Sequence, residues 1–175
     1  MEPEIKQAGE DLFNFAVDRD DIKSLLEALP EDAPIERSRV EYELAILRII
    51  SVGWSLSYFL GRWEHKHHLT ELYWEAIREF AQSVSASAGL LVGKDIDYFQ
   101  VLKDRLAGYV EAMERQPEAR EPAAVIGPEF ARRCGNGEEI HTIMAGTRMF
   151  IASMASVKAY LEVLMQQGVP RTGLS

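Results

Sequence analysis

The stretch WEHKHHLTEL, residues 63–72, combines three histidines with two glutamates, side chains that bind divalent metal ions and transfer protons. On a helix, Glu64 and His68 would lie one turn apart, and so would His67 and Glu71. Each residue advances about 100° around a helix, however, which places these side chains away from the apolar positions. The predicted core face of this helix consists of Leu69, Leu72, Tyr73, Ala76, Phe80, Val84 and Leu91. We therefore predict a solvent-exposed, charge-paired helix start, and we assign no metal ligand and no catalytic residue to it.

The Glu64-x-x-His67 spacing recurs as Glu138-x-x-His141 at the start of the last predicted helix. Two such motifs on two helices of a bundle resemble the Glu-x-x-His motifs of ferritin-like di-iron carboxylate proteins. The resemblance covers these four residues and implies a metal-dependent enzyme that uses them as ligands. It departs from the family's pattern because both motifs lie in the first turn of their helices and point away from the core faces. A di-iron-like enzyme is therefore the third of three hypotheses.

Two arginines lie inside otherwise apolar helical segments, at Arg48 and Arg148. A guanidinium in an apolar setting needs a carboxylate, backbone carbonyls or an anionic ligand. Glu41, Glu43 or Glu162 could supply the carboxylate from within the chain. If the two arginines instead reached one cavity, they would anchor a small acidic molecule. A ligand-binding bundle anchored by Arg48 or Arg148 is therefore the second hypothesis.

Trp63 and Trp74 fall on one side of the third predicted helix, off its main core face. Large aromatic side chains are rarely left in water, because they bury much apolar area when they find a contact. We therefore expect this side of the helix to meet the N-terminal helix or a partner protein.

Helical periodicity dominates the sequence, and strand patterns are close to absent. We predict five substantial helices, over residues 5–29 with an interruption around 18–21, 38–61, 64–91, 95–116 and 136–167. One or two further helical turns start at Pro128 within the 117–137 connection. The predicted caps are Ser38 with Glu41, Asp95, and Asn136 with Glu139. The fold class is all-α, a helical bundle in one domain over residues 1–168, followed by a flexible tail at 169–175.

The last predicted helix has apolar side chains on two faces. We expect the core face to consist of Ile140, Ile143, Met144, Thr147, Phe150, Ile151, Met154, Leu161 and Met165. Small residues line the opposite side, at Ala145, Ala152, Ser156 and Ala159, with Gly146 and Ser153 beside them. The segment 44–60 is also apolar nearly all round. Two such helices exceed what a five-helix bundle needs to bury, which favours self-association as a homodimer. A crowded core within a single chain is the alternative explanation.

Composition excludes several classes of function for a chain of 175 residues. The net charge of −9 disfavours binding to a phosphate backbone, so nucleic acid is not an expected partner. The apolar segments 49–61 and 142–165 are too short or too interrupted by charge to span a membrane. The one cysteine, Cys134, cannot form an intramolecular disulfide, and the acidic N-terminus does not read as a secretory signal. These observations predict a cytoplasmic protein.

No P-loop, dinucleotide-binding fingerprint or nucleophile motif occurs in the sequence. Arg132 and Arg133 could lower the pKa of the neighbouring Cys134 thiol, but an unreactive thiol at a helix end is the favoured interpretation. No cofactor is implied. The leading hypothesis is a non-enzymatic helical-bundle protein that acts as an interaction or regulatory module, forms a homodimer and binds an unidentified protein partner.

Overall fold

The computed structural model describes residues 1–169 and 174, and in that part of the chain it contains helices and no strand. This confirms the predicted all-α helical bundle. The first predicted helix is two helices in the structure, since the chain breaks at Asp18–Arg19, where Asp18 accepts a hydrogen bond from the Asp20 amide at 3.2 Å. The helices are α1 (Glu2–Val17), α2 (Asp20–Glu27), α3 (Arg37–Phe59), α4 (Lys66–Val92), α5 (Tyr98–Glu114), α6 (Ala123–Arg133) and α7 (Ile140–Gln167).

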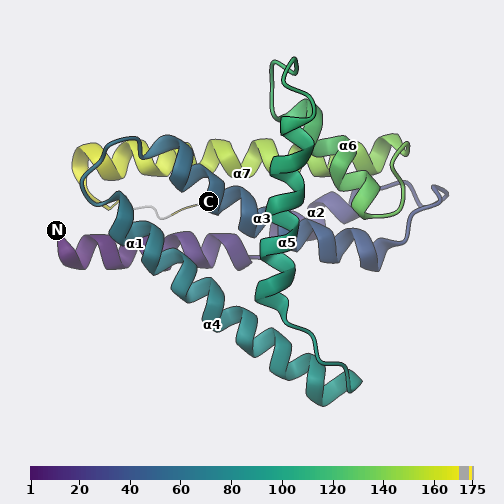
Figure 1. The fold of residues 1–175 in the computed structure, drawn as a ribbon, viewed down its shortest axis with the longest axis horizontal. Helices are drawn as coiled ribbons and strands as arrows, with labels where there is room; N and C mark the ends of the chain where they lie inside the picture. The colour runs from purple at the N-terminus through teal and green to yellow at the C-terminus, as the bar shows by residue number, and fades with distance from the viewer. Residues whose placement is uncertain (170–173, 175) are drawn as a thin grey trace.

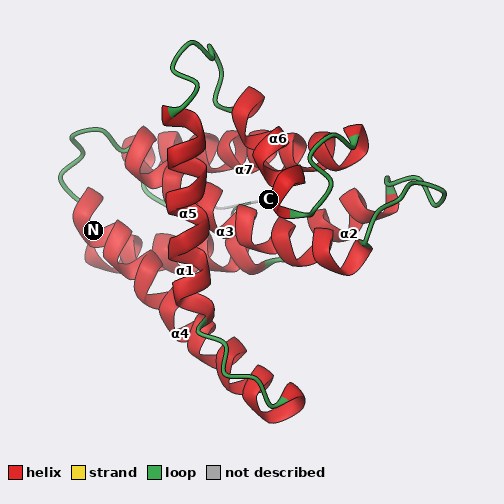
Figure 2. Ribbon diagram, turned by 45° about the vertical axis from the view of Figure 1, so that its right-hand side comes forward, coloured by secondary structure: helices red, strands yellow, loops and turns green. Residues whose placement is uncertain are grey.

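The helix α3 is the centre of the fold, because it contacts all six other helices. In Figure 1, α1 and α7 lie along the length of the molecule, α5 crosses in front of α3, and α4 runs obliquely away from them. Figure 2 shows that the last turns of α4 extend beyond the other helices, with the connection to α5 folded back beside them. We call residues 86–92 the α4 free end. Each described helix is too short or too polar to cross a membrane.

The helix starts differ from the predicted caps by a few residues. Glu36 precedes α3, and Ser38 lies inside the helix without a capping bond. Asp97, not Asp95, caps α5 by accepting a hydrogen bond from the Gln100 amide at 3.0 Å.

Asn136 does not cap α7, because its side-chain amide donates to the Pro34 carbonyl oxygen at 3.2 Å and ties this turn to the α2–α3 connection. Glu139 takes the capping position and accepts from the Thr142 amide at 2.6 Å. Pro128, predicted as a first helical residue, lies inside α6. The predicted flexible tail falls, apart from Val169 and Leu174, outside the described residues.

The core face predicted for the last helix is wrong in part. Ile140, Met144 and Ile151 are 57%, 40% and 51% exposed. The buried residues of α7 are Thr142, Ala145, Gly146, Met149, Phe150, Ser153, Val157, Tyr160, Leu161 and Leu164. The reason is the close approach of α6, where a Cβ added to Gly146 would lie 2.5 Å from the ring of Phe130. Part of the small-residue side therefore faces the core, and part of the large apolar stripe faces water.

Candidate interaction surface

In the histidine-rich stretch, Glu64, His67 and Glu71 are exposed, whereas His65 and His68 are half-buried. The helix α4 begins at Lys66, so Glu64 and His65 precede it. His68 Nε2 lies 3.0 Å from Glu2 Oε1 of α1, and His67 is exposed. The stretch therefore joins the start of α4 to the start of α1 through charged side chains.

The two Glu-x-x-His motifs do not form one site. His68 lies 3.0 Å from Glu2 at the start of α1, and a Cβ added to Gly168, directly after α7, would lie 2.7 Å from Oε1 of Glu4 in the same turn of α1. The Glu64 motif is thus near the C-terminal end of α7, whereas Glu138 and His141 lie at its N-terminal end. Within residues 1–169 and 174, no three His, Cys, Asp or Glu side chains are grouped to hold a metal ion.

His141 instead takes part in the start of α7. Its Nδ1 lies 2.9 Å from Glu139 Oε1, and Glu139 Oε2 accepts a further hydrogen bond from the Thr142 hydroxyl at 2.7 Å. Although burial raises the pKa of Glu139, the hydrogen bonds from Thr142 and His141 lower it to about 2. The carboxylate is therefore held charged at the positive end of the helix dipole, which is a structural role.

Arg48 is buried, 2% exposed, and finds its partners within the chain. Its Nη1 donates to Asp21 Oδ2 at 2.6 Å, and its Nε donates to the Phe15 carbonyl oxygen at 2.7 Å. The guanidinium lies 4.0 Å above the Phe15 ring and within 3.9 Å of Met149 Sδ. The carboxylate is Asp21, not one of the three glutamates expected from the sequence. Arg48 thus joins α1, α2, α3 and α7.

Arg148 lies elsewhere, exposed on α7, and makes no ion pair with a residue that the structure describes. It lines a hollow of about 130 Å³ with His141, Met144 and Ala145 of α7 and with three residues from α2 and its C-terminal end, Leu25, Ala28 and Leu29. Arg48 points instead to Asp21, so the two arginines do not converge on one cavity.

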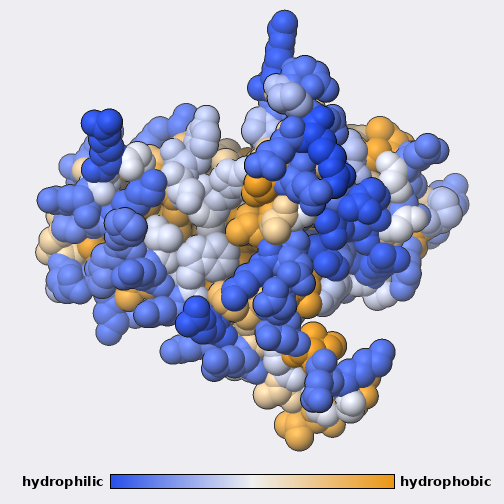
Figure 3. All heavy atoms as spheres, viewed as in Figure 1, coloured by the Kyte–Doolittle hydropathy of each residue, from blue (hydrophilic) through white to orange (hydrophobic). Residues whose placement is uncertain are grey.

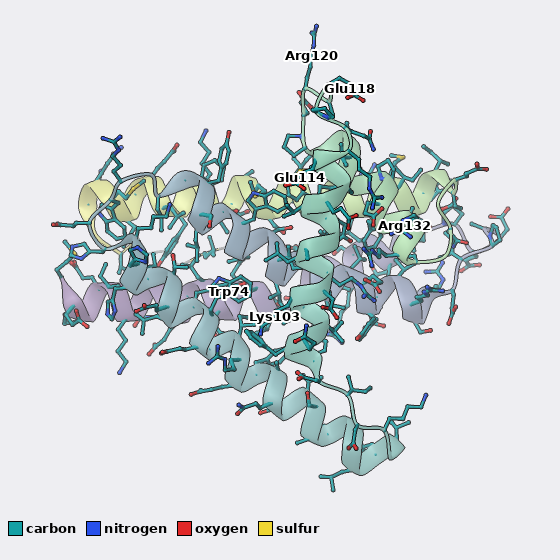
Figure 4. All side chains as sticks on the ribbon, viewed as in Figure 1. Trp74, Lys103, Glu114, Glu118, Arg120 and Arg132 are labelled. Atoms are coloured by element: carbon teal, nitrogen blue, oxygen red, sulfur yellow. The ribbon has the colours of Figure 1, made fainter. Side chains whose placement is uncertain are left out.

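Trp63 and Trp74 are half-buried and contact other parts of the same chain. The ring of Trp74 covers Gly53 of α3 so closely that a Cβ there would lie 2.2 Å from Cζ2. Figure 4 places Trp74 among the crossing helices, away from the α4 free end. Trp63 packs edge-on against His65, with ring centres 5.1 Å apart. We expected Trp74 to contact the N-terminal helix or a partner protein, but in the structure it contacts α3.

The structure contains a buried polar cluster between α3, α5 and α6 that the sequence analysis did not predict. Glu43 is 2% exposed and receives a two-pronged contact from Arg105, with Nη2 at 2.7 Å from Oε1 and Nε at 3.0 Å from Oε2. The Tyr109 hydroxyl is buried without a hydrogen-bond partner among the described residues, and burial raises its pKa far above the usual value. Burial also raises the pKa of Cys134 to about 12, which makes it an unreactive thiol. The sequence signal for this cluster was a glutamate within an apolar helix.

The outer side of α7 is a partly apolar helix face that the described part of the chain leaves open. We call it the outer α7 face, and it consists of the exposed residues Ile140, Met144, Arg148, Ile151, Ala152, Ala155, Lys158, Ala159, Glu162 and Val163. A groove of about 580 Å³, which we call the α3–α7 groove, runs along one flank, where Trp54 and Tyr58 of α3 meet α7. Its lining is completed by Phe150, Ile151 and Met154 of α7, Met113 of α5 and residues 121–123 before and at the start of α6. Tyr58 is 71% exposed, and Trp54 meets Phe150 edge to face. The Arg148 hollow lies on the opposite flank.

The α4 free end is a second apolar surface. Leu90, Leu91 and Val92 are 88%, 85% and 65% exposed, although Leu91 was predicted to lie in the core. Figure 3 shows hydrophobic side chains at this end, at the bottom of the view. Ala81 is the last fully buried residue of α4 and Val84 still packs against the core, whereas the last turns of α4 run past the other helices.

The geometry therefore offers interaction surfaces, and it assigns structural contacts to most of the predicted site residues. Comparisons of this chain with protein-family models, with curated proteins and with solved structures found no match.

Proposed function

We propose that this protein is a non-enzymatic interaction module that self-associates as a homodimer through the outer α7 face. The observation that carries the proposal is the row of exposed apolar side chains on that face, at Ile140, Met144, Ile151 and Val163. Exposed apolar side chains on one helix face favour an interaction site, since their burial stabilises by about 25 cal/mol per Å². Here they alternate with the exposed charged side chains of Arg148, Lys158 and Glu162.

The shape of the region supports a second copy as the partner. The outer α7 face is a ridge with a hollow on each flank, the α3–α7 groove on one side and the Arg148 hollow on the other. In a two-fold dimer the same patch must fit itself, and a ridge between two hollows meets that requirement. The exposed alanines at 152, 155 and 159 allow a second helix to approach closely.

Binding of a small acidic molecule is less favoured, because Arg48 is already paired with Asp21 and Arg148 is at the surface. A cytoplasmic location is proposed on the single cysteine, which is buried as a free thiol in a form suited to a reducing compartment. Fractionation of cells that express the protein tests the location, and recovery outside the cytoplasm would contradict it.

Sedimentation equilibrium tests self-association. We expect a species of twice the 19.8 kDa chain mass at micromolar concentration. Ile151→Glu places a charge on the ridge at a half-exposed position and should weaken the dimer about tenfold or more while leaving the monomer folded.

Matched variants separate the possible surfaces. Val110→Glu, on the exposed side of α5, should leave the dimer unchanged, and so should Leu91→Glu at the α4 free end. A monomeric wild-type protein contradicts the proposal. If Leu91→Glu disrupts the dimer and Ile151→Glu does not, the interface lies at the α4 free end and not on the outer α7 face.

A further inference from the structure

We propose that two copies pair α7 with α7 in antiparallel orientation, about a two-fold axis at Ala155, with Arg148 opposite Glu162 of the partner subunit. This inference rests on the proposed self-association and adds its register and its charge contacts. The starting observation concerns Arg148, which is the charged residue in the part of the outer α7 face from Ile140 to Ala155. It has no ion-pair partner in the described chain.

The spacing of the residues determines the register. About a two-fold axis, residues equally far from the axis in opposite directions lie opposite one another. Arg148 lies seven residues before Ala155 and Glu162 lies seven after it. The axis at Ala155 therefore produces the same ion pair twice, once at each side. An axis at Arg148 or at Glu162 would instead bring like charges together.

In the same register, large side chains of one copy lie opposite small side chains of the other. Ile151 lies four residues before Ala155, and Ala159 lies four after it, so a large side chain of each copy meets a small one. Ala155 meets its own copy at the axis, and it is exposed in the single chain. Small side chains at the closest point let the helix axes approach to about 8 Å, the lower end for packed helices.

The charges are free to pair across the interface. The contact that Glu162 makes within the chain is with Lys158, at 3.8 Å, between side chains that are 54% and 55% exposed. An exposed pair of this kind contributes little to stability. Arginine binds a carboxylate through two parallel hydrogen bonds, and exclusion of water at an interface strengthens such a pair.

The crossing angle follows from the reach of the side chains. Seven residues of helix span about 10 Å, so Arg148 and its partner stay close only when the helices cross at a shallow angle of about 20°. A steep crossing would separate the pair while leaving the contact at Ala155 intact. The ion pairs therefore specify the angle as well as the register.

Charge reversal tests the pairing by sedimentation equilibrium. Arg148→Glu and Glu162→Arg should each weaken the dimer about tenfold or more, and the double variant should return its dissociation constant to within about threefold of wild type. Both residues are exposed, so circular dichroism should show unchanged folding. The matched control reverses Glu111 and Arg115, an exposed ion pair on α5, and should leave the dimer unchanged.

Cross-linking provides a second, independent measurement. Ala155→Cys should form a covalent dimer on mild oxidation, since the two-fold axis places both thiols together. Ala107→Cys, exposed on α5, is the control that should not cross-link at this rate. The native Cys134 is buried and does not compete.

The outcomes separate this inference from the function on which it rests. A wild-type dimer that the double reversal fails to restore, or that Ala155→Cys does not cross-link, overturns the register and leaves self-association in place. A wild-type monomer overturns both. Rescue together with cross-linking establishes the antiparallel pair.

Discussion

Glu43 shows how a charged residue contributes to this fold at the scale of single side chains. It is enclosed between helices, and its charge is met by the fork of Arg105. Arg48 is a second case, held by Asp21 and the Phe15 carbonyl oxygen. In both, the dehydration of a charge is offset by a specific partner, so removal of one partner is far more destabilising than removal of both.

Arg105→Met should therefore lower the free energy of unfolding by about 3 kcal/mol, because it leaves Glu43 buried and unpaired. The double variant with Glu43→Leu should recover most of that loss. Urea denaturation at one fixed protein concentration measures both.

Arg115→Met is the control for that pair, since it removes the exposed contact with Glu111 and should change stability by less than about 0.5 kcal/mol. If Arg105→Met behaves like this control, the buried pair does not carry the stability assigned to it.

At the scale of elements, the contact between α6 and α7 decides which side of α7 is buried. Gly127 and Gly146 let the two helices approach until the Phe130 ring rests on the α7 backbone. A Cβ added at Gly127 would lie 2.1 Å from Thr147 Oγ1, so neither helix tolerates a larger residue at the contact without moving. The same contact turns Met144 and Ile151 toward water and creates the outer α7 face.

Gly146→Ala should consequently destabilise the fold by about 1–3 kcal/mol through overpacking against Phe130. The loss should be smaller in a Phe130→Leu background, which a double-mutant cycle by thermal unfolding would measure. Gly89→Ala is the control, because no atom lies within 4 Å of its added Cβ and alanine is the better helix former. Equal effects of the two substitutions would contradict the close contact.

At the scale of the molecule, one hydrophobic core draws residues from every helix. Its members include Ile5 of α1, Ile22 of α2, Leu69 of α4, Leu102 of α5 and Met149 of α7. The side of α5 that faces away from this core, and the turn after α5, carry charged side chains. Among them are Lys103, Glu114, Glu118 and Arg120 (Figure 4). A shared core predicts that residues 1–168 unfold as one domain.

Calorimetry should therefore show one unfolding transition, and its midpoint should rise with protein concentration if the proposed dimer forms in the folded state. The Ile151→Glu variant should show the single transition without the concentration dependence. Two separate transitions would contradict the single domain. A midpoint independent of concentration in the wild-type protein would contradict the dimer.

The fold class, the approximate helix ranges and the exposure of Glu64, His67 and Glu71 could be predicted from the sequence. These depend on hydrophobic periodicity and on proline and glycine positions, which act over one or two helical turns. The break at 18–21 was visible for the same reason. Helix caps were missed by a few residues, since Asn136 bonds to Pro34, far away in the chain.

The sequence did not predict which apolar face of α7 is buried, which carboxylate pairs with Arg48, or that Trp74 covers Gly53, because these depend on contacts between helices. A helix with two apolar faces has two comparable ways to pack, and the choice depends on the shape of its neighbour. Here Gly146 fits Phe130, and that contact lies between residues from different helices. Asp21 likewise reaches Arg48 only because α2 folds back over α3. Local patterns specify helices, whereas complementary shape and charge between distant segments specify the surface that is left for a partner.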